Sequence, residues 1–187
     1  TAVLCSAPAE VEGRHNEDAA GIWETPWGVV LAVADGMGGQ PGGAGAAAIA
    51  IDMLDARLPE VEAGGLRAGI LDAFEAANRE ILSRGTGGGT TLVVAEISDR
   101  KARIYHAGDS GAVIVGQRGR VCFESVNHSP CGFAVAAGLL DRNEVQEHLD
   151  RHFLSNHVGS EEMHIEVGPP ISLALFPTVL LASDGVL

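Results

Sequence analysis

Short apolar runs alternate with glycine-containing turns along much of the chain, and this pattern predicts a series of strands. Residues 28–35 (GVVLAVAD) are apolar at nearly every position and end at Asp-Gly, which is typical of a buried strand. A meander of four antiparallel strands is expected later in the chain, at residues 90–97, 102–106, 112–116 and 120–124. Strand patterns return at residues 164–167 and 178–182.

Two helices are expected between the first strand and the meander. Residues 44–58 contain good helix formers, with Ile49, Met53 and Leu54 facing inward, and Pro59 stops the helix. Residues 66–83 place apolar side chains at i, i+4, i+7 and i+11, namely Ile70, Phe74, Ala77 and Ile81. Residues 132–152 have a weaker helical pattern. Together these elements predict an α+β fold, a sandwich of two antiparallel sheets packed face to face with helices on the outer faces.

Composition narrows the class of protein. The chain has 187 residues without a linker or repeat, so we expect a single domain over residues 1–187. Its net charge of −13 and its lack of a basic run argue against a nucleic-acid or anionic-membrane surface. No stretch reaches the about 18 apolar residues that span a bilayer. The three cysteines fit no metal-site spacing and are read as reduced thiols, which predicts a cytoplasmic protein.

Carboxylates stand at the ends of apolar strands. Asp35, Asp109 and Asp184 each follow such a run and have glycine or serine as neighbours, and Glu17 and Asp18 precede another expected strand. If these acids meet, their repulsion favours a bound cation, and oxygen ligands select Mg²⁺ or Mn²⁺. Taken singly, each such pair favours an ordinary turn, and only the recurrence of acids at three strand ends in one acidic chain weakens that interpretation.

Five short motifs in order resemble the metal-dependent protein phosphatases of the PPM family, the type 2C serine/threonine phosphatases, over essentially the whole chain. They are Asn16-Glu17-Asp18-Ala19, Ala34-Asp35-Gly36-Met37-Gly38-Gly39, Gly89-Thr90-Thr91, Gly108-Asp109-Ser110 and Ser183-Asp184-Gly185. The resemblance implies the same sandwich of two antiparallel sheets flanked by helices. It also implies a signalling enzyme that acts on phosphorylated proteins, with a serine/threonine kinase and its substrates as partners.

The resemblance assigns roles to particular residues. Asp35 would bridge two Mg²⁺ or Mn²⁺ ions, and the Gly36 carbonyl and Glu17 would bind the same pair. Asp184 would complete the first metal's shell and, with Asp109, hold a third, weaker ion. Asp18 would lie next to the metal ligands and orient them without binding a metal itself. A hydroxide bridging the metals would then hydrolyse phosphoserine or phosphothreonine directly, without a phosphoenzyme.

Several positions depart from the family pattern. The arginine that clamps the substrate phosphate is displaced by one residue, to Arg14, because Gly13 occupies its usual place. Met37 replaces a histidine that eukaryotic members are thought to use as an acid. The family continues to an Asp-Asn metal ligand, whereas this sequence stops at Leu187, so we expect that it is truncated at the C-terminal end.

Alternative functions follow from the same residues. The chain is also compatible with a catalytically weak, phosphatase-like regulatory or binding domain. A serine hydrolase that uses Ser110 is a remote alternative, because Gly108-Asp109-Ser110-Gly111 matches the nucleophile segment of chymotrypsin-like proteases. His148 and His152 are spaced i, i+4 on an expected helix, where a solvated face is favoured over a metal site.

Overall fold

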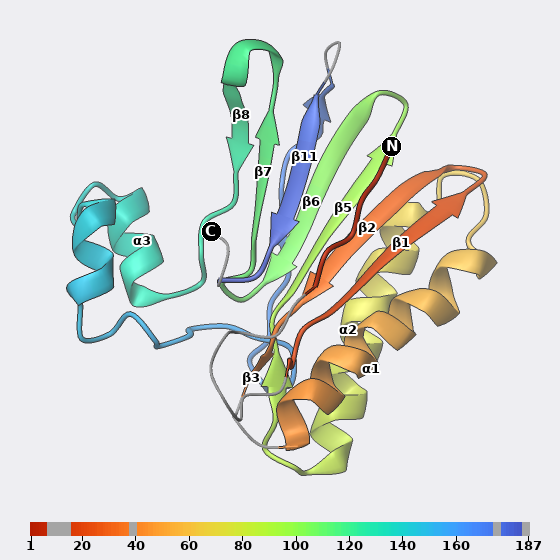
Figure 1. Cartoon of the computed structure of the whole chain (residues 1–187). Helices are drawn as coiled ribbons and strands as arrows, with labels where there is room; N and C mark the ends of the chain where they lie inside the picture. Colours follow the sequence, from red (N-terminus) through yellow and green to blue (C-terminus); the bar gives the residue numbers. More distant parts are fainter. Residues whose placement is uncertain (7–15, 38–40, 174–176, 185–187) are drawn as a thin grey trace.

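The computed structural model describes residues 1–6, 16–37, 41–173 and 177–184. Figure 1 shows two antiparallel sheets packed against each other, with helices α1 and α2 side by side on the outer face of the larger sheet. Helix α3 lies apart from this pair, beyond strand β8. The arrangement confirms the predicted α+β sandwich.

The larger sheet is built from antiparallel neighbours. Its order is β1 (Ala19–Thr25), β2 (Gly28–Ala34), β5 (Leu92–Ser98), β6 (Lys101–Ala107) and β10 (Ile171–Ser172), and β9 (Glu166–Val167) also pairs with β6. Strands β1 and β2 form a hairpin in which Ala19 faces Ala34 and Thr25 faces Gly28. Because Asp18 precedes β1 and Asp35 follows β2, this register brings both acids to the same end of the hairpin.

The smaller sheet has the order β11 (Thr178–Ala182), β7 (Gly111–Val115) and β8 (Val121–Glu124). A separate two-stranded ladder joins β3 (Gly36–Met37) to β4 (Gly89–Thr90). The predicted meander is therefore wrong in its topology, because β5 pairs with β6 in one sheet and β7 with β8 in the other. The chain crosses between the sheets at residues 108–110, which include Asp109.

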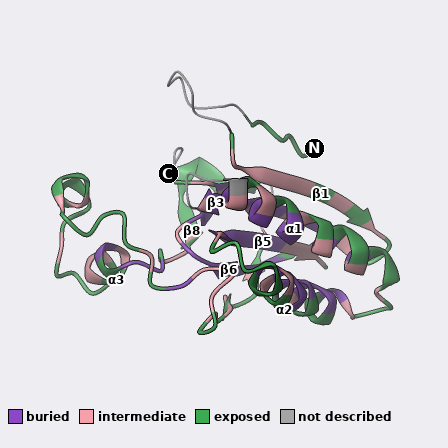
Figure 2. Ribbon diagram, turned by 90° about the horizontal axis from the view of Figure 1, so that it is seen from below, coloured by how far each residue is buried: buried purple, intermediate pink, exposed green. Residues whose placement is uncertain are grey.

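Both predicted helices are present. Helix α1 (Pro41–Arg57) is followed by a short 3-10 helix, Leu58–Glu60, and α2 spans Leu66–Arg84. Gly85 ends α2 in the left-handed conformation, with φ of 62°. The buried faces of both helices point toward the sheet (Figure 2). The predicted stripe on α2 is confirmed, since its four members are all buried, namely Ile70, Phe74, Ala77 and Ile81.

The core consists of two layers on opposite faces of the larger sheet. One layer joins this sheet to α1 and α2, and the other fills the space between the two sheets. On β5, Leu92 and Val94 belong to the first layer, and Val93 and Ala95 belong to the second. This double burial explains why β2 and β5 are apolar at nearly every position instead of alternating.

Two further expectations differ from the structure. The strand expected at residues 90–97 is divided, because Thr90 pairs within the small β3–β4 ladder and β5 begins only at Leu92. The weakly helical stretch contains α3 (Pro130–Ala136) and a 3-10 helix at Arg142–Glu147. His148 and His152 lie after this helix, so the expected helical pairing of the two histidines is wrong. No helix in the described ranges is both long and apolar enough to cross a membrane.

Replacing Phe74 by alanine tests the layer between α2 and the larger sheet. Phe74 is completely buried, so Phe74→Ala is expected to lower the free energy of unfolding by about 3–5 kcal/mol through lost burial and the cavity that remains. Urea denaturation measures this difference. Leu82→Ala on the same helix is the control, because Leu82 is 40% exposed, and it should change stability by less than about 1 kcal/mol. Equal effects of the two substitutions would contradict the assigned packing.

Candidate functional site

Four aspartates from distant parts of the chain converge at one end of the sandwich. Asp35 follows β2, and the charges that act on it come from Asp18, Asp184 and Asp109. Burial, together with repulsion by these three carboxylates, raises the pKa of Asp35 from 3.8 to about 7. Such repulsion falls with distance, so the four acids belong to one electrostatic cluster, although no three of these described residues offer ligand atoms within 4.8 Å of one another.

Asp109 is the second perturbed acid of this cluster. Burial and the neighbouring charge of Asp184 raise its pKa to about 6, although a hydrogen bond to its own backbone lowers it. Asp184 is itself exposed at the end of β11, whereas Asp35 and Asp109 are only partly accessible. The cluster therefore has three partly buried aspartates, Asp18, Asp35 and Asp109, with the exposed Asp184 beside them.

Threonines that follow the glycine run hold Asp35 in place. The carbonyl oxygen of Asp35 accepts hydrogen bonds from the Thr90 hydroxyl at 2.8 Å and from the Thr91 N–H at 2.9 Å. The Asp35 N–H donates to the Thr91 hydroxyl at 3.1 Å. Thr90 and Thr91 are both buried. The Thr-Thr pair, expected to be a structural element, thus fixes the backbone that presents the Asp35 carboxylate.

Thr91 also links Asp35 to the segment that carries Asp109. The hydroxyls of Thr91 and Ser110 are 2.6 Å apart and share a hydrogen bond. Gly108 adopts a φ of +116°, and a Cβ at this position would lie 2.7 Å from the Thr91 Cβ. Only glycine fits this conformation and this approach. The end of β2 and the crossover between the sheets are therefore tied together at Thr91.

Glu17 and Gly36 lie together next to the start of α1. The Gly36 N–H donates to the Glu17 carbonyl at 3.3 Å. A Cβ on Gly43 would lie 2.9 Å from Glu17 Oε2, and a Cβ on Gly36 would lie 2.4 Å from the Gly43 carbonyl oxygen. Glycines at these positions therefore allow the Glu17 carboxylate and the turn after Asp35 to pack closely against the helix.

Asp18 connects the two ends of the chain that meet at the site. Its Oδ2 accepts a hydrogen bond from the Ser183 hydroxyl at 3.3 Å, and its N–H donates to Asn16 Oδ1 at 3.1 Å. Ser183 directly precedes Asp184. Asp18 thus links the residue before β1 to the end of β11, and its role in orienting the site stays a prediction.

The chemistry of the donors fits a hard divalent cation. The clustered side chains offer only carboxylate oxygens, the ligand type that suits Mg²⁺ and Mn²⁺. Burial and then repulsion by neighbouring carboxylates raise the pKa values of Asp35 and Asp109, and a bound cation would relieve this repulsion. Asp35, Asp109, Asp184 and Glu17 remain the predicted metal-ligating side chains.

Three other residues, Arg14, Met37 and Ser110, were singled out in the sequence in addition to the acids. Arg14, the expected phosphate clamp, lies outside the described residues. Met37 pairs with Gly89 in the β3–β4 ladder, and its thioether has no proton to donate. Ser110 is only 1% exposed, and the His106 Nε2 binds the Val126 carbonyl at 3.0 Å. Among the described residues no histidine hydrogen-bonds to Ser110, whose hydroxyl pairs with that of Thr91, and this burial argues against a serine hydrolase.

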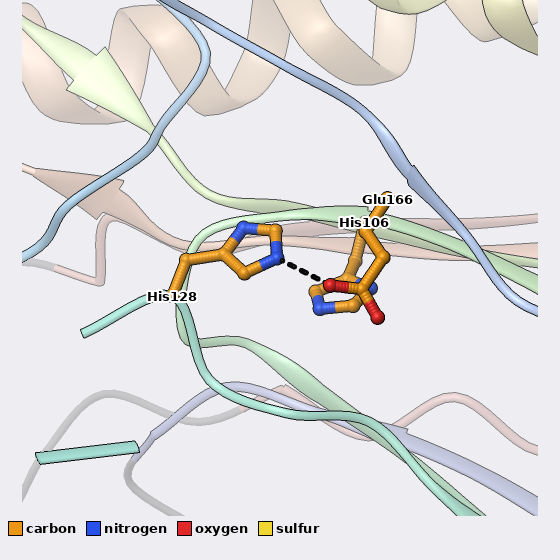
Figure 3. A group of neighbouring side chains, drawn as sticks. All are labelled: His106, His128 and Glu166. Carbon is orange, nitrogen blue, oxygen red and sulfur yellow. Dashed lines mark hydrogen bonds and ion pairs between the residues drawn. The ribbon is translucent and has the colours of Figure 1, made fainter. Parts of the chain in front are cut away.

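A second cluster was not predicted. The potential ligand atoms of His106, His128 and Glu166 lie within 4.8 Å of one another, and among the described residues this is the only such group of three. Figure 3 shows the side chains converging from β6, from the segment before α3 and from β9. The three residues are far apart in the sequence, and only the pairing of β6 with β9 brings Glu166 next to His106.

The chain is similar to known protein phosphatases. The protein phosphatase 2C family matches residues 7–187. A serine/threonine phosphatase, Stp, from Listeria monocytogenes serotype 4b (strain F2365) is 27% identical over 185 residues, covering 92% of this chain and 73% of the relative. The solved structure of the S. agalactiae serine/threonine phosphatase is 26% identical with a TM-score of 0.84, covering 97% of this chain and 78% of the other.

A further solved structure shares the fold. It is the catalytic domain of the serine/threonine phosphatase PstP in complex with two manganese ions. The TM-score is 0.78 at 23% identity, and the match covers 97% of this chain and 76% of that one.

The clustered acids predict a pH dependence of stability in the metal-free protein. Because the folded-state pKa values of Asp35 and Asp109 are raised, their contribution to stability is fully present below about pH 4 and is lost as the pH rises through about 6 and 7. Asp35→Asn should therefore make the unfolding free energy fall less steeply between pH 5 and pH 8. Urea denaturation with a chelator present measures both slopes.

Asp72→Asn is the matched control for this experiment. Asp72 is an exposed acid on α2, away from the cluster, and its substitution should leave the wild-type slope unchanged. The electrostatic account is contradicted if Asp35→Asn and Asp72→Asn give the same pH dependence as the wild type.

Proposed function

Because the chain belongs to the protein phosphatase 2C family, we propose that the acids around Asp35 form the active site of a metal-dependent serine/threonine protein phosphatase. The observation that carries this proposal is the convergence of Asp18, Asp109 and Asp184 on Asp35, with its raised pKa. Neither a turn nor a solvated surface explains why acids from four separate segments gather at one end of the sandwich, three of them at partly buried positions.

We assign the following roles to the site residues. Asp35, Glu17, Asp109, Asp184 and the Gly36 carbonyl would hold the Mg²⁺ or Mn²⁺ ions, with Asp35 as the central ligand of a pair. Asp184 would serve the first ion and, with Asp109, a third, weaker one. The manganese complex of PstP, which has the same fold, supports the choice of metal. Asp18 does not need to touch an ion, because its contacts with Ser183 and Asn16 suit an orienting role.

When bound, paired divalent ions activate a water molecule and neutralise charge on the phosphoryl oxygens. The protein's part is to hold the acids in a fixed arrangement. Thr90 and Thr91 immobilise the Asp35 backbone, and the link from Thr91 to Ser110 sets the distance to the Asp109 segment. Since Ser110 is buried in this network, phosphate transfer to it is excluded, which supports direct hydrolysis without a phosphoenzyme.

The substrates proposed for this site are proteins carrying phosphoserine or phosphothreonine. The names of the Listeria and S. agalactiae relatives support this substrate class. A serine/threonine kinase that produces these substrates is the proposed partner, and Arg14 is the proposed binder of their phosphate. A cytoplasmic location is also proposed, and it is supported by three free cysteines, Cys5, Cys122 and Cys131.

Hydrolysis of p-nitrophenyl phosphate in the presence of Mn²⁺ tests the proposed function. The wild type should be active, and excess chelator should abolish the activity. Asp35→Asn should lower kcat/KM by about 100-fold or more, because removal of the bridging carboxylate leaves the ions unpositioned. Asp72→Asn on the exposed side of α2 should retain wild-type activity. Circular dichroism would establish that each variant is folded.

Two results would contradict the proposal. Activity that persists in chelator would exclude a metal-dependent reaction, and an unchanged rate in Asp35→Asn would exclude Asp35 as the central ligand. A folded wild type that binds Mn²⁺ and phosphopeptides but does not hydrolyse them would instead support the regulatory alternative.

A further inference from the structure

The cluster of His106, His128 and Glu166 lies next to the segment that carries Asp109. His128 is completely buried, and its ring stacks on that of His106 with the centroids 4.4 Å apart. His128 Nε2 is 3.1 Å from Glu166 Oε2, the contact drawn in Figure 3. The phosphatase activity proposed above assigns no role to any of the three residues.

Hydrogen bonds determine which nitrogen of His128 carries the proton. Nδ1 faces the Gly108 N–H at 3.2 Å and Asn156 Nδ2 at 2.8 Å. The orientation of the Asn156 amide is fixed, because its Oδ1 accepts from the His164 N–H and its Nδ2 donates to the His164 carbonyl. Two donors therefore point at Nδ1, which must be the acceptor. The proton is on Nε2 and is donated to Glu166.

This assignment argues against a cation between the three side chains. A metal ligand needs a free lone pair, but Nε2 of His128 carries the proton and Nδ1 already accepts hydrogen bonds. Burial and the neighbouring His106 also lower the pKa of His128, which favours the neutral ring. His106 in turn points its Nε2 at the Val126 carbonyl, 3.0 Å away, where the nitrogen acts as a donor.

His128 holds Gly108 through two hydrogen bonds. The ring accepts from the Gly108 N–H at 3.2 Å, and the backbone N–H of His128 donates to the Gly108 carbonyl at 3.0 Å. On another side, Thr91 packs so closely against Gly108 that no side chain would fit. Asp109 is the next residue in the chain. Its position is therefore set by a glycine held between Thr91 and His128.

We propose that His128, oriented by Glu166 and Asn156, is a positioning residue that fixes the Gly108–Asp109 backbone so that Asp109 faces the metal centre. This inference rests on the proposed function, in which Asp109 helps to bind a divalent ion. Glu166 selects the tautomer of His128, and the tautomer provides the acceptor for the Gly108 N–H. Glu166 on β9 thus affects the position of Asp109 indirectly, because it orients the neutral imidazole of His128 that binds Gly108.

Binding of Mn²⁺ to the chelator-treated protein, measured by calorimetry and by the electron paramagnetic resonance of free Mn²⁺, tests the proposal. Glu166→Leu should weaken the binding step that depends on Asp109 by about 10-fold, the lower end of the range for residues that orient metal ligands. Glu166→Gln retains an acceptor for the Nε2 proton and should recover most of the affinity. Glu162→Leu, at another exposed glutamate, should bind as the wild type does.

A double-mutant cycle separates positioning from general destabilisation. If Glu166 acts through Asp109, Glu166→Leu should have no further effect on Mn²⁺ affinity in an Asp109→Asn background. The proposal is overturned if the two effects multiply, or if Glu166→Leu alone leaves the affinity unchanged. Urea denaturation of the same variants would show whether lost affinity merely follows lost stability, an outcome that also overturns the proposal.

The experiment distinguishes failure of this inference from failure of the proposed function. Normal Mn²⁺ binding by Asp35→Asn would show that Asp35 is not part of a metal centre, and it would contradict the proposed function itself. Suppose that Asp35→Asn and Asp109→Asn lose Mn²⁺ binding while Glu166→Leu binds fully. This result would contradict the positioning role of His128 and leave the proposed function intact. Tight Zn²⁺ binding that disappears in Glu166→Leu but persists in Asp35→Asn would show a metal site at the histidines and would contradict the tautomer assignment.

Discussion

The structure depends on holding like charges together at partly buried positions. Burial disfavours the ionised forms of Asp35 and Asp109, and repulsion from Asp18 and Asp184 adds to this cost. In the absence of a cation, the cluster opposes folding at neutral pH, so the rest of the chain must supply the stability. Two core layers, one on each face of the larger sheet, provide it. The same repulsion gives the site its preference for a divalent cation.

Hydroxyl groups that bind the backbone, together with glycines that allow close approach, set the geometry of this cluster. Thr91 binds Asp35 through its N–H and its hydroxyl, and the hydroxyl also contacts Ser110, so one buried residue links the end of β2 to the crossover between the sheets. The close approach of Gly108 to Thr91 and of Gly36 to Gly43 requires glycine at these places. Strand ends supply rigid positions, and the glycines let them come close enough for the acids to act together.

Local patterns were sufficient to predict some parts of the molecule and not others. The stripe from Ile70 to Ile81 and the run ending at Asp35 predicted α2 and β2, because periodicity and burial agree there. The division of the expected meander between two sheets could not be predicted, since nothing in residues 107–111 specifies which sheet the next strand joins. The family motifs named the acids, but no local signal indicated His128 with Glu166, whose contact depends on the pairing of β9 with β6. Contacts of that kind arise only from tertiary structure.

Anomalous diffraction from crystals of the protein grown with Mn²⁺ tests the central claim most directly. The account predicts two manganese peaks bridged by the Asp35 carboxylate, with the Gly36 carbonyl and Asp184 among the ligands. It would be contradicted by crystals in which the space around Asp35 contains no manganese, or in which the metal lies only between His106, His128 and Glu166.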